Sequence, residues 1–173
     1  MAKRFVFIIV LWVFTNSLVY SGSRNELVKT YRKYIGVREL TGNNDGCEVE
    51  MFLRSTGLGK GYAWCAAFVT YCHMKNGLPS PQLAPAWAAA WFPEYRLIKN
   101  ENALPGDVFG IYYVKMKRIG HVGFIDESWN NDSNNIITVE GNTNGDGSRE
   151  GDGVYRKRRS KKQIKSVSRW IQE

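Results

Sequence analysis

The chain has 173 residues, a length typical of a single domain, and it is 43% hydrophobic and 23% charged. These ordinary globular values exclude a long disordered or collagen-like chain. No apolar stretch reaches the roughly 18–20 residues that span a bilayer, which excludes a multi-span membrane protein. The formal net charge of +8 suits an anionic partner such as an envelope polymer, although charge alone does not identify that partner.

The first 23 residues have the layout of an export signal. Lys3 and Arg4 precede the apolar run FVFIIVLWVF at positions 5–14, and small residues follow at positions 21–23. A basic start, a short apolar core and small residues near a cut predict a secretory signal peptide. We expect residues 1–23 to be removed and residues 24–173 to form one catalytic domain. That domain would be periplasmic or secreted, with no stable membrane insertion after cleavage. The alternative is a retained N-terminal anchor.

The cysteines are Cys47, Cys65 and Cys72, an odd number for an oxidising compartment. Cys65 and Cys72 are seven residues apart on one expected helix, about 10 Å along its axis, which is too far for a disulfide. Two arrangements remain open, a Cys47–Cys72 disulfide or three free thiols.

The N-terminal half of the domain reads as helices. Ser23 and Glu26 form a capping-box pattern at the start of a helix with apolar residues at helical spacing. Further helices are expected over residues 47–55 and 62–75, and a short one over residues 86–92.

From residue 105 onward, β-prone apolar runs alternate with turns. Strands are expected over residues 108–114, 121–125, 136–140, 154–158 and 167–171, with a helical turn over residues 160–164. Helices followed by an antiparallel meander predict an α+β fold.

A thiol, an imidazole and a carboxylate are available for nucleophilic catalysis. Cys65 lies in the first turn of its helix, where free N–H groups and the helix dipole lower a thiol pKa. His73 is eight residues further along the same helix, about 12 Å away, so His121 is the candidate base. Glu140 or Asn142 could orient the ring, and spacing alone does not choose between them. Each residue also has a structural interpretation, since an isolated cysteine on a helix is often a small core residue.

Four motifs occur in order: YAWCAAFVTYC at 62–72, PGDV at 105–108, GHVG at 120–123 and VEGN at 139–142. Together they resemble the CHAP family of cysteine, histidine-dependent amidohydrolases and peptidases, which is related to the NlpC-type and papain-like enzymes. The resemblance implies an α+β papain-like fold in which N-terminal helices pack on an antiparallel β-sheet meander.

The resemblance also implies roles for individual residues. Cys65 would be the nucleophile, His121 the base, Glu140 the residue that orients the ring, and Asn142 an assisting polar residue. The family cuts peptidoglycan, either at the N-acetylmuramoyl–L-alanine amide or within the stem and cross-bridge peptides. We therefore expect an exported peptidoglycan hydrolase that works through a thioester intermediate.

Substrate contacts are expected next to the nucleophile. The backbone N–H of Cys65 would stabilise the oxyanion, with Asn44 or Tyr62 as a second donor. Tyr62, Trp64, Trp87 and Trp91 are candidates for lining the groove, although Trp87 and Trp91 fit a core position better.

We expect no metal and no other cofactor. The loop at residues 43–48 offers oxygen ligands but few carboxylates for a hard cation, and no zinc-ligand spacing occurs. The protein is expected to be a monomer with peptidoglycan as its partner.

Two other functions compete with hydrolysis. One is a catalytically silent cell-wall-binding module of the same fold. The other is nucleic-acid binding through the basic run RKRRSKK at 156–162, which in an exported protein more often lies on a solvated strand edge. We therefore expect no nucleic-acid partner.

Overall fold

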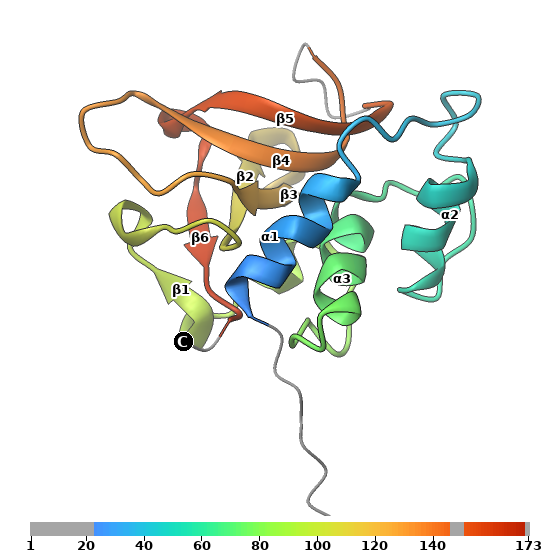
Figure 1. The fold of residues 1–173 in the computed structure, drawn as a ribbon, viewed down its shortest axis with the longest axis horizontal. Coiled ribbons are helices and arrows are strands. Elements are labelled where there is room, and N and C mark those ends of the chain that lie inside the picture. The colour runs from blue at the N-terminus through green and yellow to red at the C-terminus, as the bar shows by residue number, and fades with distance from the viewer. Residues whose placement is uncertain (1–22, 146–150, 172–173) are drawn as a thin grey trace, which may run out of the picture.

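The structure, a computed structural model, describes residues 23–145 and 151–171. Three helices, α1 (Arg24–Lys33), α2 (Cys47–Arg54) and α3 (Cys65–Lys75), precede a six-stranded antiparallel sheet (Figure 1). This confirms the predicted α+β fold. The predicted signal peptide, apart from residue 23, lies outside the described residues. No helix in the described part of the chain is both long and apolar enough to cross a membrane.

The sheet has the strand order β1-β6-β2-β3-β4-β5. Its strands are β1 (Leu97–Ile98), β2 (Val108–Tyr113), β3 (Arg118–Ile125), β4 (Asn135–Thr143), β5 (Gly153–Ser160) and β6 (Ser166–Ser168). Strands β2 to β5 form the predicted meander. Strand β6 returns to pair with β2, and β1 adds to its outer side.

Several predicted boundaries differ from the structure. The third helix begins at Cys65 rather than at position 62, and a 3₁₀ turn over Ala88–Trp91 replaces the short helix expected at 86–92. Strands β3 and β4 are longer than expected, so His121 and Glu140 lie inside their strands rather than at the ends. The two-residue strand β1 was not predicted, because its only strand partner is β6, some 70 residues later.

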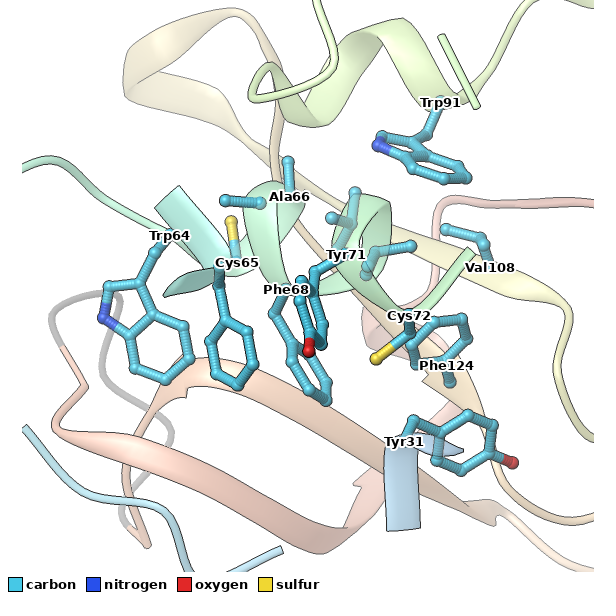
Figure 2. Close-up of a cluster of buried hydrophobic side chains, with 14 of the residues drawn as sticks. Tyr31, Trp64, Cys65, Ala66, Phe68, Tyr71, Cys72, Trp91, Val108 and Phe124 are labelled. Atoms are coloured by element: carbon cyan, nitrogen blue, oxygen red, sulfur yellow. The ribbon is translucent and has the colours of Figure 1, made fainter. Parts of the chain in front are cut away.

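Helix α3 is the centre of the core. It contacts α1, α2, β3 and β4, and every residue from Cys65 to His73 is buried. The sequence had indicated one buried face, whereas the helix is covered on all sides. Figure 2 shows the aromatic side chains around it, with Trp64 at one end and Phe124 and Tyr31 at the other.

All three cysteines are free thiols, so the Cys47–Cys72 disulfide that the sequence left open is not formed. Cys47 is exposed, whereas Cys65 and Cys72 are buried. The sulfurs of Cys65 and Cys72 lie in separate parts of the core cluster (Figure 2).

The PGDV motif joins the two ends of the domain. Asp107 is fully buried and accepts hydrogen bonds from Arg24 at the start of α1 and from Arg169 after β6. The Arg169 contacts are 3.0 and 2.8 Å, and the Leu104 N–H donates to the same carboxylate at 2.9 Å. A buried carboxylate with these partners stabilises the fold and lies outside the chemical site.

The Asp107 contacts predict a stability effect. Asp107→Asn should lower the free energy of unfolding by about 2–3 kcal/mol, less than the roughly 3–5 kcal/mol for wholly buried pairs because both arginines are partly exposed. Urea denaturation followed by tryptophan fluorescence measures it, with the exposed Asp132→Asn as control. An Asp107→Asn midpoint equal to the wild-type value would contradict this role.

Candidate active site

The start of α3 is fixed by a residue from the sheet. Gly61 has a φ of +94°, and the chain stays non-helical up to Trp64. The Trp64 N–H donates to Asn142 Oδ1 on β4 at 3.0 Å, so the helix begins at Cys65. The N–H groups of the first helical turn have no acceptor within the helix, and they surround the Cys65 side chain with positive potential.

The imidazole of His121 lies between the other two reactive groups. Its Nε2 is 2.8 Å from Glu140 Oε2. The side chains of His121 and Cys65 line the same small cavity, and each shifts the pKa of the other. The structure therefore brings the three predicted residues together from α3, β3 and β4. Of the two candidates for orienting the ring, Glu140 is the one that contacts it.

The thiol and the ring perturb each other's proton affinity. Burial raises the pKa of the Cys65 thiol, but the hydrogen bond and charge of His121 and the N–H groups of Val122 and Ala66 outweigh it. The Cys65 pKa is consequently lowered. Burial lowers the pKa of the His121 ring, yet its hydrogen bonds to Cys65 and Glu140 raise that pKa to about 9. A lowered thiol pKa and a raised imidazole pKa favour a thiolate–imidazolium pair at neutral pH.

Glu140 is fully buried and still ionised. Besides His121, it accepts a hydrogen bond from Thr138 Oγ1 at 2.6 Å and two from Arg159, at 2.7 and 2.6 Å. Burial raises the pKa of this carboxyl group, but the hydrogen bonds from Arg159 and His121 hold it well below its ordinary range.

Two motif glycines make room for this geometry. A Cβ on Gly123 would lie 2.9 Å from Glu140 Cγ, and a Cβ on Gly141 would lie 2.7 Å from the Trp64 ring. The second glycine of GHVG, Gly123, therefore allows Glu140 to lie against β3, and the glycine of VEGN, Gly141, allows α3 to pack on β4.

Asn142 supports the start of the helix rather than the ring. It has a φ of +54°, at an irregularity in the β4–β5 pairing. Besides accepting from the Trp64 N–H, its amide donates to Asn44 Oδ1 at 3.1 Å and to the Gly151 carbonyl at 3.0 Å. Glu39, which sequence reasoning missed, accepts the Trp64 indole N–H at 2.8 Å and joins the same network. The sequence carried no periodic signal for Glu39.

Cys65 is 8% exposed and lines a small cavity of about 80 Å³. His121, Trp87 and Arg118 line the same cavity, and Trp87 is half-exposed. A larger polar cavity of about 980 Å³ adjoins it, because Ala63 and Asn142 line both. Cys65 thus lies in the wall of a small cavity next to a wide polar one.

The predicted substrate contacts fall in different places. Asn44 lines the larger cavity, and Tyr62 is 58% exposed without lining either of these two cavities. Trp64 and Trp91 are fully buried. The sequence led us to expect the Trp64 side chain to contact substrate. It cannot do so in this structure, because its ring is buried in the core.

The second histidine and the basic run have structural partners. His73 is buried, its Nδ1 pairs with the Pro79 carbonyl at 2.8 Å, and burial lowers its pKa to about 4. In the basic run, Arg156 pairs with Asp126 at 2.6 Å and Arg159 is buried against Glu140. Arg159 was missed as a site residue, although strand alternation in β5 was the signal that could have separated it from its exposed neighbours.

No group of three or more His, Cys, Asp or Glu side chains suited to a metal ion occurs in residues 23–145 and 151–171. The one aspartate of the 43–48 loop, Asp45, accepts two hydrogen bonds from Thr41, at 2.9 and 2.7 Å.

A thiol at a helix start, an imidazole and a buried carboxylate are the residue types that nucleophilic cysteine chemistry needs, and the structure brings them together. The family model described as "CHAP domain" matches residues 57–142, a segment that contains Cys65, His121, Glu140 and Asn142. The matched segment is therefore a CHAP domain, as the motifs of the chain predicted. A CHAP domain indicates a hydrolase of cell-wall peptidoglycan, an amidase or a peptidase. Comparisons with curated proteins and with solved structures find no match.

The close approach of Gly123 to Glu140 can be tested. Gly123→Ala should push the carboxylate away from His121 and slow alkylation of Cys65 by iodoacetamide at pH 6 by about tenfold. The reason is that each unit of thiol pKa changes the thiolate fraction about tenfold. Gly59→Ala is the control, since a Cβ there meets nothing within 4 Å. Equal alkylation rates in the two variants would contradict the role of Gly123.

Proposed function

We propose that the protein is an exported peptidoglycan hydrolase that cleaves an amide bond of murein by cysteine nucleophilic catalysis. Cys65 is the nucleophile, His121 the general base and acid, and Glu140 the residue that orients the ring. The bond is the N-acetylmuramoyl–L-alanine amide or one within the stem and cross-bridge peptides. The observation that carries this proposal is the position of the His121 ring, which lies 2.8 Å from Glu140 and lines the same small cavity as Cys65 at the start of α3.

Acylation follows from the charge state of the pair. The Cys65 thiolate attacks the carbonyl carbon of the substrate amide, and negative charge develops on the carbonyl oxygen. The backbone N–H of Cys65, at the free end of the helix, stabilises that oxyanion. The His121 imidazolium then gives its proton to the leaving amine, the C–N bond breaks and a thioester remains.

Deacylation uses the same groups in reverse. Neutral His121 takes a proton from a water molecule as that water attacks the thioester carbonyl. The C–S bond breaks, the carboxylic acid leaves, and the thiolate–imidazolium pair is restored. Glu140 stays ionised throughout and stabilises the imidazolium, as the carboxylate does in a catalytic triad.

The surroundings of the sulfur suit a polar polymer substrate. The small cavity is lined by Cys65 and His121, and the adjoining cavity offers polar groups from Glu39, Asn44 and Asp152. Peptidoglycan lies outside the cytoplasmic membrane, which agrees with the basic and apolar start of the sequence as an export signal. In the basic run, the ion pairs of Arg156 and Arg159 favour a structural role over nucleic-acid binding.

The nucleophile assignment predicts the loss of murein turnover. Cys65→Ala should fold and reduce release of fragments from purified sacculi by at least about 10³-fold, as loss of a nucleophile does in triad enzymes. Cys47→Ser, which removes an exposed thiol, should retain turnover. Mass spectrometry of the fragments identifies the bond: new N-terminal L-alanine indicates an amidase, and shortened stems or split cross-links an endopeptidase. Undiminished turnover by Cys65→Ala refutes the assignment, and a wild-type protein that binds sacculi without cutting them would be the silent module.

The raised pKa of His121 predicts the alkaline side of the pH–rate profile. Because the protonated ring is the acid for the leaving amine, kcat/KM should fall as the pH rises through about 9. The measurement is the initial rate of murein cleavage between pH 5 and pH 10. A fall already centred near the ordinary histidine value, about 6.5, would contradict the coupling of His121 to Cys65 and Glu140.

A further inference from the structure

Arg159 is a buried arginine on β5 that binds both oxygens of Glu140. Its Nε donates to Oε1 at 2.7 Å and its Nη2 to Oε2 at 2.6 Å. Only 6% of the residue is exposed, whereas its neighbour Arg158 is exposed. A two-point arginine–carboxylate pair fixes the plane of the carboxylate as well as its charge.

The charged and titratable groups around this pair come from three further elements. His121 faces Glu140 from β3, Cys65 faces the other side of that ring from α3, and Tyr113 on β2 lies in the field of Arg159. Thr138, on the same strand as Glu140, adds a neutral donor. Among these groups, Arg159 is the one whose positive charge persists at every working pH.

Without the charge of Arg159, the buried Glu140 carboxylate would bind a proton more tightly. Burial disfavours its ionised form, and an adjacent cation offsets this by lowering a carboxyl pKa by about 1–3 units. Once protonated, Glu140 would no longer offer the imidazolium a negative charge, and one of its oxygens would carry a proton itself. The His121 ring would then lose both its stabilisation and its fixed orientation.

We propose that Arg159 is a positioning residue that acts on Cys65 through Glu140 and His121. By its two-point ion pair it keeps Glu140 ionised and aligned, so that the ring stays protonated and directed at the sulfur. Arg159 lies outside the segment matched by the family model, which ends at residue 142. The inference rests on the proposed function for its effect on turnover, while its effect on the thiol can be measured without any substrate.

The test is the pH dependence of Cys65 alkylation by iodoacetamide, followed by peptide mass spectrometry. The exposed Cys47 in the same sample is the internal reference. Arg159→Met should move the acid limb of the Cys65 profile to higher pH by at least about 1 unit, because a protonated or misaligned Glu140 no longer supports the imidazolium that favours the thiolate. Arg159→Lys should recover part of the shift, because lysine restores the charge but not the fork.

Arg158→Met is the matched control. It removes the same charge from the adjacent, exposed position of β5 and should leave the acid limb in place. An unchanged limb in Arg159→Met, or a shift to lower pH, would overturn the proposal. If Arg159→Met does not fold, as judged by circular dichroism, Arg159→Lys decides, since a wild-type acid limb in that variant also overturns it.

A double variant separates a path through Glu140 from a general effect of packing. In a Glu140→Gln background, Arg159→Met should produce no further shift of the limb. A further shift of the same size would refute action through Glu140. Because murein does not enter this measurement, failure of the proposed hydrolysis leaves its outcome intact.

Discussion

The proposed chemistry of this protein depends on an ionised carboxylate that is fully buried in the protein interior. Glu140 has no exposure to solvent, and the unfavourable burial of its charge is offset by hydrogen bonds from His121, Thr138 and Arg159. Because Glu140 remains negative, the imidazole beside it holds its proton more tightly, and the imidazolium in turn favours the thiolate of Cys65. Glu140 thus lowers the proton affinity of the Cys65 thiol through His121.

The fold provides that arrangement by joining separate elements at one point. Helix α3 presents Cys65 at its first residue, β3 presents His121 and β4 presents Glu140, so the sheet and the helix must meet in a fixed register. Asn142 fixes the junction through the Trp64 N–H, and the missing side chain of Gly141 lets the helix approach β4. The same positions that allow close packing therefore set the geometry of the reactive groups.

Much of this could be predicted from the sequence because it is local or carried by motifs. Helix caps, periodic apolar residues and turn residues identified all three α-helices, and the order of the motifs indicated Cys65, His121 and Glu140. Effects that depend on distant partners were missed. The sequence predicts a helix start at position 62, because nothing local indicates that the Trp64 N–H pairs with Asn142, 78 residues later. The sequence predicts that Arg159 is a surface charge like its neighbours. In the structure, the pairing of β5 with β4 directs its side chain into the protein. The burial of Trp64 likewise depends on tertiary packing, which the local sequence does not indicate.

The central claim is that Cys65 and His121 form a thiolate–imidazolium pair at rest. ¹⁵N NMR tests it directly by reporting the protonation state of the histidine rings. The chain has two histidines, and burial lowers the pKa of the other, His73, to about 4. At pH 7 we expect one charged and one neutral ring, the charged one titrating at about pH 9 and losing that elevation in Cys65→Ala. Two neutral rings at pH 7 would contradict the account, because His121 would then be an ordinary base beside a protonated thiol.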